Sequence, residues 1–107
     1  MFLAYAGDKG YGLVDYELYI PKEWFSGDFF RLREECHIPE EKTFATKNQI
    51  AQRMLNQVIK SGRFQVQWVG CDAAYGNDHG FLDGLELPEG VWYFAAVSYT
   101  HLTLPTN

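Results

Sequence analysis

Residues 68–76 read WVGCDAAYG, an apolar segment that ends at a single carboxylate, Asp72. Residues 65–71 begin with alternating polar and apolar side chains and then become continuously apolar. This pattern is typical of a strand that enters a sheet covered on both faces. Residues 46–61 carry apolar side chains at helical spacing and lead into this segment. A helix that leads into a buried strand indicates an α/β architecture.

Asp72 occupies the position directly after the predicted strand. In an α/β sheet, ligands and metal ions collect beyond the carboxyl ends of strands, where side chains converge. A carboxylate there can bind Mg²⁺, which prefers oxygen ligands. An aspartate after a strand also commonly forms a turn or caps a helix by accepting nearby N–H groups. Spacing alone favours the turn or cap, because one carboxylate does not make a metal site.

The N-terminal part of the chain is predicted to form a hairpin. Residues 1–6 and 11–20 are its strands, and the sequence GDKG at 7–10 is its turn, because Asp8 and the two glycines tolerate turn dihedrals. In the second strand Val14, Tyr16, Leu18 and Ile20 alternate with more polar residues, so we expect them on the buried face. Pro21 ends the ladder because it has no N–H to donate.

Two further helices and a strand complete the predicted order. Ser26 is expected to cap a short helix that runs to about Arg33, and Gly62 to end the long helix of residues 46–61. Asn77 or Asp78 is expected to cap a helix that runs to about Leu85. Residues 91–97, VWYFAAV, are an apolar run of strand length. Together these elements predict an α/β fold with a mixed sheet and flanking helices.

Composition limits the function further. The chain has 107 residues, about one domain, and a formal net charge of −5, which lacks the basic footprint of a free-standing nucleic-acid binder. No apolar run approaches the ~20 residues of a membrane span, and no signal peptide is recognisable. Two distant cysteines form no CxxC motif. We therefore expect a cytoplasmic protein that does not enter the membrane.

Other residues with possible chemistry favour structural roles. Cys36, His37, Cys71 and His79 could be imagined as a zinc set, but their spacing matches no familiar site. His79, beside the expected cap Asp78, is interpreted as a solvated helix-start residue. Arg31 and Arg33 are interpreted as part of an ordinary charged helix face.

Lys47 is placed unfavourably for the helix dipole, because it lies near the start of the long helix. This position mildly suggests a further role, such as an approach to DNA phosphate. A solvated lysine is the simpler reading.

Four segments in the same order resemble the catalytic core of insertion-sequence transposases of the DDE superfamily endonuclease type. They are DYELYIPKEWF at 15–25, FATKNQIAQRML at 44–55, WVGCDAAYG at 68–76 and VWYFAAV at 91–97. The resemblance implies an RNase H-like fold and three acidic residues that bind Mg²⁺ to cleave and join DNA at transposon ends. Asp72 matches the second of the three, as a catalytic residue and metal ligand. Tyr75 and Gly76 would shape the turn that aims it, through the dihedral freedom of glycine.

The first and third acidic residues of that pattern have no counterpart in this sequence. The family carries the first on a strand before the segment seen here and the third on a helix beyond residue 97. Asp8, Asp15, Glu86 and Glu89 lie in predicted turns, strands or loops and are not assigned to either place. We therefore expect residues 1–97 to be an incomplete RNase H-like fold, truncated at both ends. Such a chain is expected to be inactive alone, with unpaired strand edges and marginal or aggregation-prone behaviour.

The last ten residues are interpreted separately from this domain. The stretch from Val97 to Thr106 resembles the translation of an adapter used in transposon-based sequencing libraries, so residues 98–107 are predicted to be a non-native tail. A native polar tail is the alternative.

Three functions remain open from the sequence. The first is part of a DDE transposase that acts on transposon-end DNA with Mg²⁺ and can form a homo-oligomer. The second is a small non-catalytic α/β domain for protein association, in which Asp72 is a turn former and the aromatic residues form a contact surface. The third is part of another RNase H-like nuclease, which would share the fold and Asp72.

Overall fold

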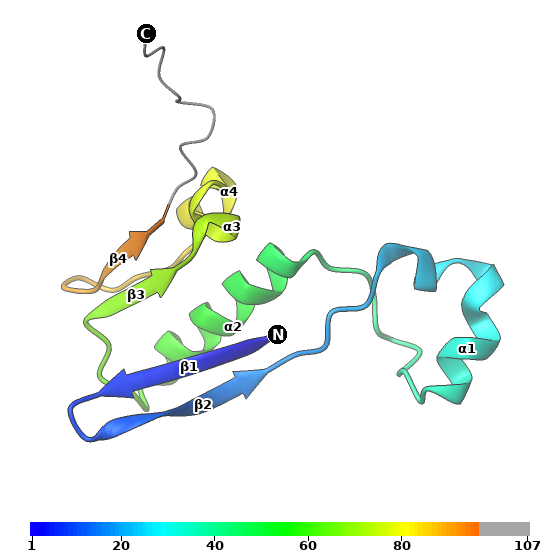
Figure 1. The fold of residues 1–107 in the computed structure, drawn as a ribbon, viewed down its shortest axis with the longest axis horizontal. Coiled ribbons are helices and arrows are strands. Elements are labelled where there is room, and N and C mark those ends of the chain that lie inside the picture. The colour runs from blue at the N-terminus through cyan, green and yellow to red at the C-terminus, as the bar shows by residue number, and fades with distance from the viewer. Residues whose placement is uncertain (97–107) are drawn as a thin grey trace, which may run out of the picture. The chain divides into compact units, whose positions relative to one another are not determined.

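The computed structural model describes residues 1–96 (Figure 1). Val97 and the predicted tail at 98–107 lie outside the described residues. Strands and helices follow one another along the chain, which confirms the α/β class. The elements are β1 (Phe2–Gly7), β2 (Gly10–Tyr16), η1 (Lys22–Phe25), η2 (Gly27–Phe29), α1 (Phe30–Glu35), α2 (Lys47–Ser61), β3 (Trp68–Cys71), α3 (Ala73–Gly76), α4 (His79–Asp83) and β4 (Trp92–Ala95).

The described strands form two separate sheets instead of one mixed sheet. β1 pairs antiparallel with β2, and β3 pairs parallel with β4. The chain divides into two compact units, Met1–Ala51 and Gln52–Asn107, and each unit holds one sheet. α2 contributes residues to both units. Each strand has one neighbour within residues 1–96, so each sheet has two open edges, as expected for an incomplete fold.

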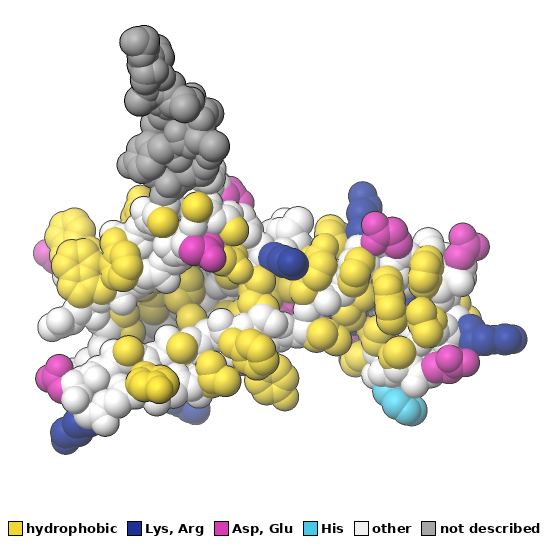
Figure 2. Space-filling model, in the orientation of Figure 1, with side chains coloured by type: hydrophobic (Ala, Val, Ile, Leu, Met, Phe, Trp, Pro, Cys, Tyr) yellow, Lys and Arg dark blue, Asp and Glu magenta, His cyan; other side chains and the backbone are white. Residues whose placement is uncertain are grey.

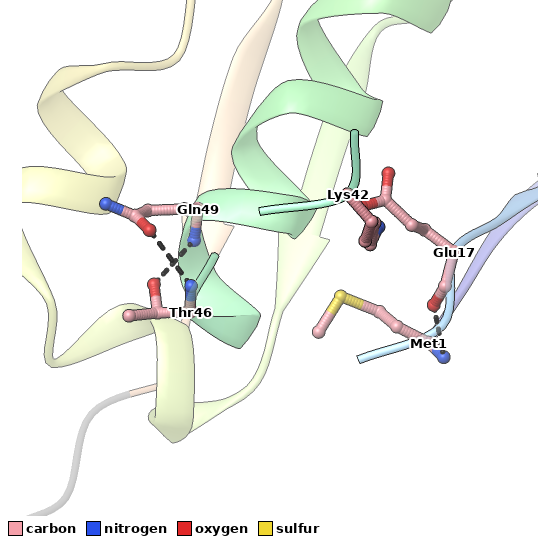
Figure 3. Close-up of polar contacts among 5 residues, drawn as sticks. All are labelled: Met1, Glu17, Lys42, Thr46 and Gln49. Carbon is pink, nitrogen blue, oxygen red and sulfur yellow. Dashed lines mark hydrogen bonds and ion pairs between the residues drawn. The ribbon is translucent and has the colours of Figure 1, made fainter. Parts of the chain in front are cut away.

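The β1–β2 hairpin contains a bulge that the alternating sequence did not reveal. The register shifts between Leu3 and Ala4: Leu3 faces Asp15, whereas Ala4 faces Leu13, so Val14 is the extra residue. After Tyr16 the strand ends, although Met1 and Glu17 still exchange backbone hydrogen bonds at 3.0 and 2.9 Å (Figure 3). The predicted second strand is therefore too long by four residues.

Residues 17–46 pack their aromatic side chains on one another. Phe44 makes edge contacts with Tyr19 and Phe25, with ring centroids 6.3 and 6.1 Å apart. Half-buried Arg33 donates hydrogen bonds to the carbonyl oxygens of Trp24 and Ser26, so it is a structural anchor and not the ordinary charged face predicted for it. Ser26 lies at the start of η2, but its hydroxyl donates to the carbonyl oxygen of Glu23 and caps nothing.

Lys42 and Glu17 form an ion pair at 3.0 Å within the first unit. About a quarter of each side chain is exposed, 26% for Lys42 and 23% for Glu17. This pair therefore ties the chain after β2 to the segment that leads into α2.

Helix α2 begins as a capping box. The N–H of Gln49 donates to Thr46 Oγ1 at 3.1 Å, and the N–H of Thr46 donates to Gln49 Oε1 at 2.9 Å (Figure 3). Ile50 and Met54 are almost fully buried, at 1% and 2% exposure, as the apolar spacing predicts. The helix ends at Ser61, where Gly62 takes the left-handed φ of 69°. The predicted helix is confirmed within one residue at its start.

Two amide side chains of α2 hold the second unit together. Gln52 Nε2 donates to the carbonyl oxygens of Gly80 and Phe81, at 3.1 and 3.0 Å. One turn further on, Asn56 Nδ2 donates to the carbonyl oxygen of Gly84 at 3.0 Å, and its Oδ1 accepts the N–H of Glu86 at 2.8 Å. These bonds join α2 to backbone groups of α4 and of the segment after it, where a short helix cannot pair all of its own carbonyl oxygens.

Across residues 1–96, five apolar side chains are buried. They are Ile20, Ile50, Met54, Val69 and Phe81. No helix among these residues is both long and apolar enough to cross a membrane.

Candidate metal-binding carboxylate at the end of strand β3

Asp72 directly follows the last residue of β3, Cys71, and its side chain is exposed. β3 and β4 run parallel, with Cys71 paired to Ala95, so both carboxyl ends lie at the same edge of the sheet. The N–H of Ala96 donates to the carbonyl oxygen of Cys71 at 3.1 Å and extends the ladder to this edge. The sequence prediction that Asp72 lies at a strand carboxyl end is therefore met in the fold.

Helix α3 begins directly after Asp72, beyond the end of β3 (Figure 1). Its first turn fixes the direction of the Asp72 carboxylate. Asp72 Oδ1 accepts the N–H of Ala74 at 3.0 Å, which makes Asp72 the N-cap of this single turn. Its carbonyl oxygen accepts the N–H groups of Tyr75 and Gly76 at 3.1 and 2.8 Å. The cap that spacing alone favoured is thus present. It engages one carboxylate oxygen, and a carboxylate has a second oxygen for a further ligand.

Gly76 lets this turn approach the end of β4. A methyl group at position 76 would overlap the carbonyl oxygen of Ala96, and only hydrogen fits. The φ of Gly76 is not positive. The sequence-based reason for a glycine here, dihedral freedom, is therefore wrong, and the reason is close packing. The missing side chain lets the Asp72 turn lie against the neighbouring strand.

The charge of Asp72 acts on two neighbouring side chains. Burial raises the pKa of the Cys71 thiol, and the Asp72 carboxylate raises it further. The pKa of the Tyr75 hydroxyl is raised in the same way, first by burial and then by Asp72 and Cys71. Tyr75 also packs on buried Phe81, with ring centroids 5.2 Å apart. At neutral pH both groups stay protonated, so Asp72 has no thiolate or phenolate beside it.

The other candidate residues have separate places. Asp78 caps α4, since its Oδ1 accepts the N–H of Phe81 at 3.0 Å, which confirms the predicted cap. Cys36 and His37 follow α1 in the first unit, whereas Cys71 and His79 belong to the second. Within residues 1–96, no three His, Cys, Asp or Glu side chains gather as a metal would require.

Lys47 has a partner that the sequence did not indicate. Its Nζ lies 5.2 Å from the ring centroid of Tyr19, a cation–π distance. The contact offers a structural reason for a lysine at the positive end of α2. An approach of Lys47 to DNA phosphate stays a prediction.

Sequence reasoning missed four polar side chains, at the start of α2 and along it, that make structural hydrogen bonds. Thr46 and Gln49 carry a readable signal, the Thr-x-x-Gln spacing of a capping box. Gln52 and Asn56 carry none, because amides on a helix are read as solvated until the segment against which they pack is known. In the second unit, their hydrogen bonds link α2 to α4 and to the segment that follows α4.

The fold and this edge define an α/β protein with an oriented carboxylate after a parallel strand. That strand, β3, buries Val69 but leaves Trp68 exposed, so the prediction of a strand covered on both faces is wrong. Residues 1–101 match the DDE superfamily endonuclease family, and the chain belongs to that family. This membership places the chain among nucleases of the transposase type. No curated protein and no solved structure matches the chain.

Proposed function

We propose that this chain contributes part of a catalytic core that cleaves and joins DNA at transposon ends, and that Asp72 is one of its Mg²⁺ ligands. The observation that carries the proposal is the place of Asp72: exposed, at the carboxyl end of β3, with its carboxylate oriented by the first turn of α3. Family membership supports the nuclease reading over a pure association domain.

The donor chemistry at Asp72 suits a hard cation. Mg²⁺ is commonly bound through one or two carboxylates, together with waters and substrate phosphates, so one protein ligand is a partial fit. When bound, the ion would lower the pKa of a nucleophilic water or hydroxyl and stabilise charge on the leaving oxygen. The chain's own contribution is to hold Asp72 still: Ala74 fixes one oxygen and Gly76 sets the turn against β4. The remaining acidic ligands would come from outside residues 1–96.

Paramagnetic broadening tests the metal role on this chain directly. Substoichiometric Mn²⁺, a stand-in for Mg²⁺, should broaden the backbone amide signals of residues 72–76 in nuclear magnetic resonance spectra. Asp72→Asn should remove this broadening, because the amide keeps an oxygen for the Ala74 cap but loses the charge. Broadening by Mn²⁺ is detectable even when the ion binds with only millimolar affinity, and a single carboxylate can bind it that tightly.

Asp78→Asn is the matched control, since Asp78 also caps a short helix in the same unit. It should leave the broadening at residues 72–76 intact. Equal broadening around every exposed carboxylate would refute a particular role for Asp72. In a transposase catalytic domain that contains this segment, Asp72→Asn should reduce Mg²⁺-dependent nicking by more than about 100-fold, since changes outside the metal ligands already cost roughly 10–100-fold.

A further inference from the structure

The outer face of the β1–β2 hairpin is apolar along its whole length. Cross-strand partners share a face, and the register pairs Phe2 with Tyr16, Ala4 with Leu13 and Ala6 with Tyr11. All six residues are exposed. The four large ones have exposed fractions of 69% at Phe2, 89% at Tyr11, 68% at Leu13 and 75% at Tyr16. Figure 2 shows a row of hydrophobic side chains along the hairpin. We call these six residues the hairpin face.

The bulge at Val14 creates this face. Side chains alternate between the two faces of a strand, so Leu13 and Tyr16 would lie on opposite faces of a regular strand. The extra residue shifts the alternation by one and brings Tyr11, Leu13 and Tyr16 to the same side. Leu3, Tyr5 and Val14 are half-buried. The bulge therefore gathers three large exposed side chains on one face of the hairpin.

The hairpin face has a ridge and a shallow strip. Its large side chains Tyr11, Leu13 and Tyr16 all belong to β2, whereas β1 contributes Ala4 and Ala6 beside them and Phe2 at one end. The rings of Phe2 and Tyr16 lie 6.4 Å apart and form one aromatic end. A second copy turned by a two-fold axis would lay its ridge along the shallow strip of the first. Sheets pack face to face in this way at about 10 Å.

The exposed area suits such a pair. If an aromatic side chain carries roughly 200 Å², the exposed fractions of Phe2, Tyr11 and Tyr16 leave on the order of 450 Å² on three rings. With Leu13 and the two alanines, two copies would bury about 1,000 Å² in total, which is where specific interfaces begin. On each copy this patch measures about 500 Å², the size of the largest apolar patch on a typical monomer, and such patches are often functional.

We propose that the hairpin face is a self-association surface, on which two copies of this chain pack their hairpins face to face about a two-fold axis. The six residues carry no charge, so the face lacks the cations that attract a phosphate backbone and the charges that pair with a charged peptide. The same patch on both copies makes the contact isologous and closed, and the product is a dimer.

Sedimentation equilibrium of the 107-residue chain tests this proposal. The wild-type chain should show a reversible monomer–dimer equilibrium in the micromolar range. Leu13→Glu should weaken the dimer more than about 100-fold, because the carboxylate enters a two-fold interface twice and must lose water there. Added salt should tighten the dimer, because each copy carries a net charge of −5 and screening reduces their repulsion.

Leu18→Glu is the matched control. Leu18 is 66% exposed, against 68% for Leu13, but lies beyond β2, and its substitution makes the same change in charge. It should leave the dimer intact. Tyr11→Lys, at the most exposed position of the face, should dissociate the dimer with a charge of opposite sign, and it serves if Leu13→Glu fails to fold.

Four outcomes would overturn the proposal. A wild-type chain that stays monomeric at several hundred micromolar has no such interface. Equal weakening by Leu13→Glu and Leu18→Glu would reflect general repulsion. Dissociation by Trp92→Glu alone would move the contact to the exposed aromatic residues of the second sheet. A continuous series of larger species would exclude a closed pair.

Discussion

Asp72 performs one task in the structure and is proposed to perform a second. As the N-cap of α3 it satisfies the N–H of Ala74, which stabilises a turn of four residues. The same hydrogen bond removes rotational freedom from the carboxylate, which a metal ligand requires. A cap and a ligand are therefore compatible, and the choice between them that the sequence presented is not exclusive.

The pKa of the Cys71 thiol depends on the charge of Asp72. The negative carboxylate favours the protonated thiol, so Asp72→Asn should lower the pKa of Cys71. Burial, the larger cause, remains and should keep the pKa above that of a free cysteine. The rate of iodoacetamide alkylation against pH, in a Cys36→Ser background, measures the shift. Mg²⁺ bound at Asp72 should lower the pKa in the same direction.

Asp83→Asn is the control for this titration, since Asp83 carries the same charge in the same unit but is not among the causes of the Cys71 shift. It should leave the alkylation profile unchanged. An unchanged profile in Asp72→Asn would show that the carboxylate does not act on the thiol.

At the scale of elements, helix α1 is followed by a strained residue, His37, two positions after its last residue, Glu35. The N–H of Ile38 donates to the carbonyl oxygen of Arg33 at 3.0 Å and that of His37 to Glu34 at 3.1 Å, the two bonds of a Schellman motif. Glycine normally occupies the left-handed position of this motif, but here His37 has a φ of 58°. A side chain in that conformation costs roughly 1–2 kcal/mol.

His37→Gly should therefore raise the free energy of unfolding by about 0.5–1 kcal/mol, the strain relieved minus the greater entropy of glycine in the unfolded chain. Cys36→Gly is the adjacent control: Cys36 has a φ of −87°, so only the entropic cost applies and stability should fall by a similar amount. Urea unfolding followed by circular dichroism measures both. Shifts of the same sign would contradict the strain argument.

The hairpin shows how one residue changes the meaning of an apolar pattern. Alternation predicted that Val14, Tyr16, Leu18 and Ile20 share a buried face, but only Ile20 is buried, and Tyr16 and Leu18 are 75% and 66% exposed. The bulge breaks the alternation, and β2 ends at Tyr16. The pattern was read correctly as a strand, and its buried side was assigned wrongly.

At the scale of the whole molecule, few apolar side chains are buried and many large ones are exposed. Among the described residues five apolar side chains are buried, whereas Phe2, Tyr11, Leu13, Tyr16, Leu18, Phe30, Trp68, Trp92, Tyr93 and Phe94 are exposed. Each sheet of two strands also leaves open edges. Two-stranded sheets are marginally stable unless something packs on them.

The isolated chain should therefore unfold in urea with a free energy below about 5 kcal/mol, the low end for natural domains. If the hairpin face pairs two copies, the urea midpoint should rise with protein concentration, and Leu13→Glu should abolish that dependence. Circular dichroism at several concentrations measures both effects. A soluble monomer whose free energy of unfolding exceeds about 5 kcal/mol, independent of concentration, would contradict the expectation of marginal stability.

The sequence by itself determined the kinds of elements and the place of Asp72. Apolar spacing located α2, Gly62 ended it, and the run before Asp72 marked β3, because periodicity and helix-ending residues act within a few neighbours along the chain. Only the tertiary structure decided the bulge at Val14, the exposure of the hairpin face, the bonds of Gln52 and Asn56, and the contact that requires glycine at 76. These features depend on which distant backbone lies opposite each residue, and that is set by register and packing between segments.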